Sequence, residues 1–129
     1  LGGRAGGHTV LYVEDSQPNA VLLARILAGR GDVRVLAAAT GEDGLRLARE
    51  ARPALILVDV RLPDMDGPEV VRRLKEEPAT AGVPVVAVTG GVESEQLERL
   101  RAGGVLDVLY KPFDVGRLLR VVARALPLE

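Results

Sequence analysis

The sequence predicts an α/β fold in which a five-stranded parallel sheet carries helices on both faces. Five short runs of β-branched and aliphatic residues alternate strictly with five amphipathic segments of helical period, and the connections between them are short. Such alternation favours parallel strands joined by right-handed helical crossovers. A length of 129 residues and a hydrophobic content of 47% fit one domain with its own core.

The individual elements follow from their local patterns. The expected strands are, in chain order, 9–14, 33–37, 54–58, 84–88 and 105–110. The run 54–58 (ALILV) is apolar throughout, as expected of a strand buried on both faces. Pro84 stands at the first residue of its strand, where proline is tolerated. The expected helices are 18–27, 41–51, 68–75, 93–101 and 115–126.

The opening of the chain differs in composition from the rest. Residues 1–8 are glycine-rich and show no hydrophobic period, so we expect a flexible linker or the remnant of a tag before a single domain at 9–129. We expect His8 to be solvated in this tail. No apolar run approaches the ~18 residues that span a bilayer. No secretory signal is visible, so we expect a cytoplasmic location.

Composition excludes several classes of function. The chain has 17 basic and 18 acidic residues, a balance that argues against a general nucleic-acid surface. The absence of cysteine excludes disulfides, thiolate zinc sites and cysteine nucleophiles. A single histidine cannot build a histidine-based metal cluster.

Polar side chains end four of the five apolar runs. Glu14 and Asp15 follow the first strand, Asp59 the third, Thr89 the fourth and Lys111 the fifth. Carboxyl ends of parallel strands meet at one edge of the sheet, which is where such folds bind ligands. An acid after a strand is often only a helix cap. Three carboxylates brought together, however, need compensating cations, for which a divalent metal and Lys111 are the candidates.

This set of groups suits phosphoryl chemistry. A carboxylate can attack phosphorus to give an acyl phosphate, while a metal and an ammonium neutralise the phosphoryl oxygens. The Thr89 hydroxyl could bond one of those oxygens, and Gly90 would allow close approach of the backbone. Only two of the basic residues are lysines, Lys75 and Lys111, so a lysine at this strand end indicates a need for a compact point charge.

At these positions the chain resembles the receiver domains of bacterial two-component signalling, over about residues 9–127. The motifs that carry the resemblance are Val13-Glu14-Asp15, Leu57-Val58-Asp59, Leu62-Pro63-Asp64-Met65-Asp66-Gly67, Val88-Thr89-Gly90 and Lys111-Pro112-Phe113, in family order and at about family spacing. The resemblance implies a flavodoxin-like (βα)5 fold with strand order 2-1-3-4-5. Within the third motif, Asp66 and Gly67 are interpreted as an ordinary turn.

The resemblance also implies a role for each site residue. Asp59 would be the phosphoacceptor. Asp15, Asp59 and the main-chain carbonyl of Arg61 would hold Mg²⁺ (or Mn²⁺), with Glu14 helping through water. Lys111 would contact the phosphate.

The switch region departs from the family pattern. Thr89 would be the switch hydroxyl, and it is followed by Gly90 where many receivers have alanine. Val108 stands where the family usually has Tyr or Phe, three residues before the lysine. Tyr110 shares the strand face of Val108 by alternation, so we expect it to take over part of the aromatic role.

The resemblance therefore implies a signalling function. The domain would take a phosphoryl group from a phosphohistidine of a histidine kinase or a phosphotransfer protein, as one step of a phosphorelay. The face formed by the fourth helix, fifth strand and fifth helix would then change for a downstream protein partner or an output domain missing from this sequence. Receivers of hybrid sensor kinases and single-domain regulators are the similar classes, the former being cytoplasmic parts of membrane-bound kinases. Direct contact with nucleic acid or membrane is not expected.

Two alternatives remain open. A degenerate receiver would be a protein-binding module that needs no phosphate, and the altered switch region favours it. A phosphatase or phosphotransferase of the haloacid-dehalogenase type would also use a strand-end aspartate, but it needs a second aspartate two residues later. That position is Arg61, so we expect no enzyme activity beyond the domain's own phosphorylation and dephosphorylation.

Overall fold

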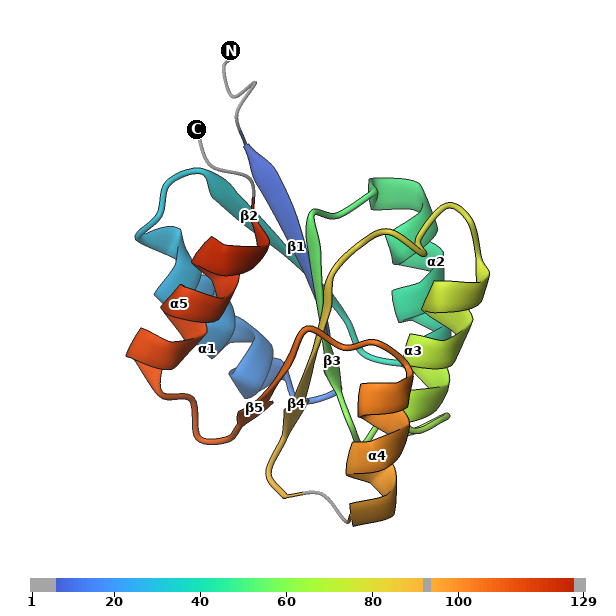
Figure 1. The fold of residues 1–129 in the computed structure, drawn as a ribbon. Coiled ribbons are helices and arrows are strands. Elements are labelled where there is room, and N and C mark those ends of the chain that lie inside the picture. The colour runs from blue at the N-terminus through green and yellow to red at the C-terminus, as the bar shows by residue number, and fades with distance from the viewer. Residues whose placement is uncertain (1–6, 92–93, 127–129) are drawn as a thin grey trace.

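The computed structural model describes residues 7–91 and 94–126 and confirms the predicted architecture (Figure 1). Five strands pair in parallel in the order β2-β1-β3-β4-β5. The strands are β1 (His8–Val13), β2 (Val33–Ala38), β3 (Leu55–Asp59), β4 (Val85–Thr89) and β5 (Asp107–Tyr110). The helices are α1 (Gln17–Ala28), α2 (Gly41–Ala51), α3 (Gly67–Glu76), α4 (Ser94–Ala102) and α5 (Val115–Ala125).

The sheet separates two apolar layers, each covered by its own helices. In Figure 1, α1 and α5 cover one face, and α2, α3 and α4 cover the other. Side chains alternate between the layers along each strand, so Leu11 and Val13 pack toward α2 and α3 while Val10 and Tyr12 pack toward α1 and α5. Every residue of β3 and β4 is buried, which for β3 confirms the prediction made from its continuous apolar run.

Element boundaries agree with the sequence expectations to within two residues, and two differences have physical causes. The expectation that His8 lies in the tail is wrong, because its amide donates to Asp32 O at 2.7 Å and His8 pairs with Val33 in the sheet. The fifth strand begins at Asp107 rather than 105, because the Val105 amide donates to Leu100 O, at the end of α4. Residues 1–6 of the expected tail lie outside the described residues. Among the helices described, none has the length and apolarity to cross a membrane.

Side-chain caps fix where four helices begin. Ser16, Thr40, Asp66 and Asp114 each accept a hydrogen bond from the backbone amide three residues on, at the starts of α1, α2, α3 and α5. Caps of this kind are worth about 1 kcal/mol each. All four follow strands, so they turn the chain away from the carboxyl edge of the sheet at defined points.

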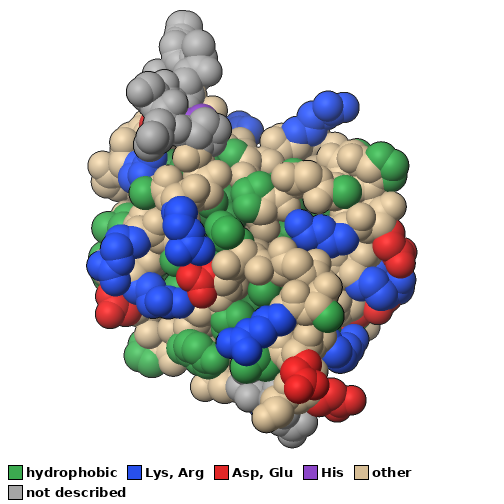
Figure 2. Space-filling view, in the orientation of Figure 1, with side chains coloured by type: hydrophobic (Ala, Val, Ile, Leu, Met, Phe, Trp, Pro, Cys, Tyr) green, Lys and Arg blue, Asp and Glu red, His purple; other side chains and the backbone are tan. Residues whose placement is uncertain are grey.

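Acidic and basic side chains are interspersed on the surface (Figure 2), and several of them form ion pairs. In Figure 2, Lys and Arg side chains are scattered over the visible face with Asp and Glu among them. Arg72 and Arg73 both bind Glu69 on α3, and Arg73 also reaches Glu42 on α2 at 3.2 Å.

Helix α4 is the most lightly anchored helix of the described chain. Leu100 is its only buried residue among those described. Its Arg99 guanidinium lies 2.9 Å from Asp66, the residue that caps α3. A helix with one buried side chain and an exposed ion pair is well suited to move.

Gly67 is a point of close backbone contact and not only part of a turn. Its amide donates to Val60 O at 2.8 Å. A β-carbon at this position would lie 2.8 Å from Val60 Cα and 2.9 Å from Asp59 O. Both of those atoms belong to the backbone, so any side chain at residue 67 would push on the end of β3.

We therefore expect Gly67→Ala to lower the free energy of unfolding by about 2 kcal/mol, the usual scale for forcing extra atoms into a packed site. The measurement is urea denaturation followed by far-UV circular dichroism. Gly82→Ala is the matched control, because a β-carbon there meets nothing within 4 Å. Equal stability of the two variants would contradict the close-contact interpretation.

Candidate functional site

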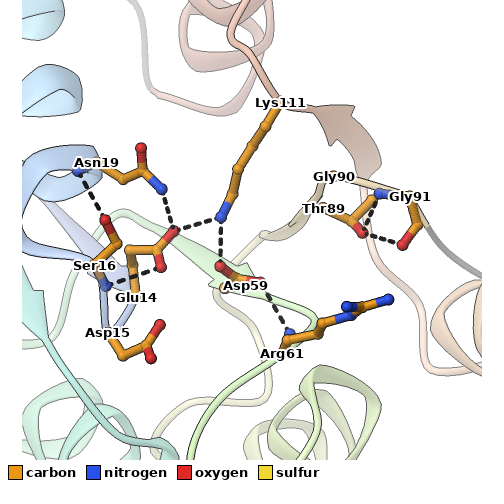
Figure 3. Close-up of a pocket in the computed structure, with 10 residues that line it drawn as sticks. All are labelled: Glu14, Asp15, Ser16, Asn19, Asp59, Arg61, Thr89, Gly90, Gly91 and Lys111. Atoms are coloured by element: carbon orange, nitrogen blue, oxygen red, sulfur yellow. Dashed lines mark hydrogen bonds and ion pairs between the residues drawn. The ribbon is translucent and has the colours of Figure 1, made fainter.

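An open pocket of about 730 Å³ lies at the carboxyl edge of the sheet (Figure 3). It brings together the residues predicted from strand ends and motifs: Glu14, Asp15, Asp59, Arg61, Thr89 and Lys111. Four further residues complete its lining: Ser16, Asn19, Gly90 and Gly91. The pocket thus draws on the connections after β1, β3, β4 and β5.

Lys111 bridges two buried carboxylates in the centre of the pocket. Its Nζ lies 2.7 Å from Asp59 Oδ2 and 2.8 Å from Glu14 Oε1. The two acid side chains are 7% and 1% exposed, while the lysine is 25% exposed. Buried charges need partners, and this ammonium group supplies one to each acid.

Glu14 is surrounded by hydrogen-bond donors. Its Oε1 accepts from the Tyr12 hydroxyl at 2.9 Å and more loosely from Asn19 Nδ2 at 3.4 Å, in addition to Lys111. Its Oε2 accepts from the Ser16 amide at 3.1 Å. Burial alone would raise the pKa of Glu14, but the hydrogen bonds, that of Lys111 foremost, lower it to about 2.

Asp59 has the opposite electrostatic balance. Its Oδ1 accepts from the Arg61 amide at 2.9 Å, and its Oδ2 accepts from Lys111. Burial and the neighbouring Glu14 carboxylate outweigh these donors, so the pKa of Asp59 is raised above its usual value. Of the two carboxylates that share Lys111, the fold therefore favours the ionised form of Glu14 and disfavours the ionised form of Asp59.

Asp15 completes an acidic cluster at the mouth of the pocket. Glu14, Asp15 and Asp59 each offer a carboxylate oxygen, and these oxygens lie within 4.8 Å of one another. Asp15 is exposed, whereas the other two are buried. A set of hard oxygen donors, part of it open to water, is the chemistry that Mg²⁺ prefers, so these residues fit such an ion. Arg61 lies on the same pocket wall, and its side chain extends away from the carboxylates in Figure 3.

Thr89 is buried, and its hydroxyl bonds within its own loop. Oγ1 accepts from the Gly91 amide at 3.0 Å and donates to Gly91 O at 2.9 Å. Figure 3 shows these two bonds on the side of the pocket away from Lys111. The Lys111 amide donates to Thr89 O at 2.8 Å, which ties the ends of β4 and β5 together.

The two residues discussed for the aromatic switch have different surroundings. Val108 belongs to the core under α2, α3 and α4. Tyr110 pairs in register with Thr89 and is 51% exposed. The aromatic ring thus stands at the surface of β5, adjacent in the sheet to the threonine.

Sequence reasoning missed the three groups that hold Glu14: the Tyr12 hydroxyl, the Ser16 amide and the Asn19 side chain. Two signals were available. Tyr12 lies two residues before Glu14, so strand alternation places both on one face. Asn19 lies three residues after the cap Ser16, one helical turn along α1.

Comparisons with known proteins identify similar chains. Residues 10–123 match the family model of the response regulator receiver domain. The polar-differentiation response regulator DivK of Brucella anthropi is 35% identical over 114 residues, which make up 88% of this chain and 92% of that protein.

Solved structures show the same architecture. The chemotaxis protein CheY4 of Vibrio cholerae superimposes with a TM-score of 0.85 at 30% identity, covering 93% of this chain and 99% of that one. The receiver domain of the sensor histidine kinase PA1611 from Pseudomonas aeruginosa, which has a magnesium ion coordinated in its active-site cleft, gives 0.83 at 32% identity, covering 92% and 97%.

The unequal pKa values of the two buried acids predict opposite effects of neutralising them. A raised pKa means that the folded protein loses stability as the pH rises above the Asp59 pKa of the unfolded chain, about 3.9. We expect Asp59→Asn to raise the free energy of unfolding at pH 7 by about 1 kcal/mol.

A lowered pKa means that Glu14 contributes stability above the unfolded value of about 4.3, which is lost as the pH falls toward 2. We expect Glu14→Gln to lower the free energy of unfolding at pH 7 by about 2 kcal/mol, because it removes an acceptor from buried donors. Urea denaturation in a chelating buffer at several pH values measures both. A fall in stability for both variants would contradict the assignment.

Proposed function

This chain belongs to the response regulator receiver domain family, and on that premise we propose that Asp59 accepts a phosphoryl group from a phosphohistidine of a histidine kinase or phosphotransfer protein. The observation that carries the proposal is the position of Asp59: it is buried at the base of the pocket, 2.7 Å from Lys111 and within 4.8 Å of two further carboxylates. The setting we infer for this reaction is the cytoplasm.

The transfer is an in-line displacement at phosphorus. A bond forms between an Asp59 carboxylate oxygen and phosphorus while the phosphorus–nitrogen bond of the donor breaks. The electron pair of that bond leaves on the imidazole nitrogen, which takes its proton from water. The product is an acyl phosphate on Asp59.

The pocket residues divide the remaining work. Asp15, Asp59 and the main-chain carbonyl of Arg61 would hold Mg²⁺ or Mn²⁺, with Glu14 acting through water, and the ion would neutralise charge on the phosphoryl oxygens. Lys111 is already paired with Asp59, so its ammonium group can follow the negative charge onto the phosphoryl group. Glu14 keeps Lys111 in the pocket while that charge moves.

Thr89 connects this chemistry to the rest of the fold. For its hydroxyl to donate to a phosphoryl oxygen, it must give up its donation to Gly91 O, and rotation of the side chain toward Asp59 would also carry Oγ1 away from the Gly91 amide. That exchange changes the loop between β4 and α4, and α4 is the helix with a single buried residue in the described chain. A shift in population of the face formed by α4, β5 and α5 follows, and a downstream protein partner reads it.

Turnover of a separate substrate is not part of the proposal. A haloacid-dehalogenase-type phosphatase needs an acid two residues after its nucleophile, where this chain carries the exposed, basic Arg61. Phosphorylation and dephosphorylation of Asp59 itself are the reactions we assign to the domain.

The direct test is intact mass after incubation with a small-molecule phosphodonor, with and without Mg²⁺. We expect one added phosphoryl group that requires both the metal and Asp59, so Asp59→Asn gains none. Asp114→Asn is the matched control, because Asp114 caps α5 outside the pocket and asparagine also caps helices.

Other outcomes are informative in different ways. An adduct that persists in Asp59→Asn would contradict the assignment of the acceptor. Release of phosphate from a simple phosphomonoester would support the phosphatase alternative. If neither the small donor nor a panel of histidine kinases gives an adduct, and a partner binds equally well to Asp59→Asn, the phosphate-independent module is the correct description.

The proposed movement of the Thr89 hydroxyl predicts a change in hydrogen exchange at the Gly91 backbone amide. When the Thr89 hydroxyl turns to the phosphoryl group, the Gly91 amide loses its acceptor and should exchange with solvent several-fold faster. Amide hydrogen exchange of the phosphorylated and unphosphorylated protein measures this, with α2 as the internal reference. In Thr89→Val the Gly91 amide should exchange fast in both states. Unchanged exchange at Gly91 on phosphorylation of the unaltered protein would contradict the switch.

A further inference from the structure

Tyr12 contacts Glu14 and also the segment that follows Lys111, its ion-pair partner. Its hydroxyl donates to Glu14 Oε1 at 2.9 Å. Its ring packs against that of Phe113, with the centroids 6.3 Å apart and the planes tilted by 55°. Phe113 lies two residues after Lys111, on the segment that delivers the lysine to the pocket. One side chain of β1 thus contacts the acid directly and packs against the loop that carries the base.

The position of Tyr12 is fixed by its burial. The residue is 0% exposed and packs in the layer under α1 and α5, among Leu23, Leu57 and Leu118. Burial and the adjacent Glu14 carboxylate raise the pKa of Tyr12, so the phenol keeps the proton that it donates to that carboxylate. A tyrosine side chain has few rotamers, and this one has no room to use them.

The hydroxyl is not needed to fill the core. Most of this layer consists of leucine and valine, and phenylalanine would occupy nearly the same volume without burying a polar atom. The tyrosine oxygen touches one acceptor, and that acceptor is the innermost carboxylate of the pocket. The hydroxyl therefore binds a residue of the pocket, whereas the ring packs in the hydrophobic core.

We propose that Tyr12 is a positioning residue, which fixes the Glu14 carboxylate against Lys111 and thereby sets the affinity of the acidic pocket for Mg²⁺. This inference rests on the proposed function, because it assumes that the cluster of Glu14, Asp15 and Asp59 holds a divalent cation. Its physical basis is the hydrogen bond from a residue behind the site.

The orientation of Glu14 matters because its two oxygens have different partners. The Ser16 amide holds Oε2, whereas Oε1 is shared by Tyr12, Lys111 and the more distant Asn19. Of these donors to Oε1, Tyr12 is the one that is fully buried and rigid. Without it, the position of Oε1 would depend on the partly exposed Lys111 and Asn19 side chains, and the carboxylate would spend less time in the orientation that faces the cation. Groups that orient the acids of a metal site typically change affinity about 10- to 100-fold when removed.

The test is the Mg²⁺ dissociation constant, measured by titration calorimetry on the whole domain. We expect Tyr12→Phe, which removes one oxygen and keeps the ring, to weaken Mg²⁺ binding about tenfold, the lower end of that range. Val86→Ala is the control for general loosening, since Val86 lies in the same layer away from the pocket. We expect it to lower stability and leave the dissociation constant within about twofold, because it removes methyl groups and no donor.

A double-mutant cycle identifies the route of the effect. If Tyr12 acts through Glu14, then Tyr12→Phe should change the dissociation constant less than about twofold when Glu14→Gln is already present. Glu14→Gln keeps Asp15 and Asp59, so binding stays measurable at millimolar metal.

Three outcomes would overturn the inference, and they are distinguishable. An unchanged dissociation constant in Tyr12→Phe removes the positioning role and leaves the proposed function standing. A tenfold loss that persists in the Glu14→Gln background assigns the effect to packing instead of orientation. No binding of Mg²⁺ by the unaltered domain would refute the metal site of the proposed function, and the inference with it.

Discussion

The ammonium group of Lys111 allows two carboxylates to be buried side by side at the carboxyl edge of the sheet. Two like charges about 4 Å apart repel by roughly 4 kcal/mol at the effective dielectric of a protein surface, so Glu14 and Asp59 need a cation between them. Lys111 supplies it at 2.8 and 2.7 Å. In the order β2-β1-β3-β4-β5, the lysine must reach from the end of β5 past β4 to β3 and β1. The lysine side chain does this with a long flexible stem and a compact point charge. The edge strand is thereby tied to the centre of the sheet by charge as well as by its pairing with β4.

The three carboxylates of the pocket share a chemistry but not an environment. Glu14 is saturated with donors and remains ionised, so it is suited to hold Lys111 and not to react. Asp59 is buried with fewer donors, and its raised pKa indicates a charge that the fold tolerates poorly. Asp15 is exposed and can exchange water for a ligand. These differences follow from burial and hydrogen-bond partners: Glu14 and Asp59 are buried with unequal numbers of donors, and Asp15 is exposed.

The parallel sheet and the location of the site could be predicted from the sequence because both depend on pattern, whereas the strand order was implied by the family resemblance. Alternation of strand and helix predicts the parallel sheet, and residues that end strands must meet at one edge. Contacts that depend on distances between elements could not be predicted in this way. Gly67 was interpreted as a turn residue, and only the short distances from a β-carbon at this position to Val60 Cα and Asp59 O show why a side chain is excluded. The hydrogen bond from the Tyr12 hydroxyl was missed, because its partner is defined by how deeply the Glu14 side chain is buried. His8 was placed outside the sheet because its pairing with Val33 depends on the path of β2, and not on its own neighbours.

The scarcity of lysine gives the Lys111 ion pair a practical consequence. The chain carries only two side-chain amines, and the other, Lys75, lies on α3 with its Nζ 3.3 Å from Val83 O. Labels on lysine side chains would therefore report on two sites, Lys111 inside the pocket and Lys75 outside it. The ratio of the reactivities of the two lysines can be measured without tryptophan fluorescence and without an identified partner. This ratio would report how strongly the ion pairs protect the Lys111 amine, with Lys75 as an internal standard in the same molecule.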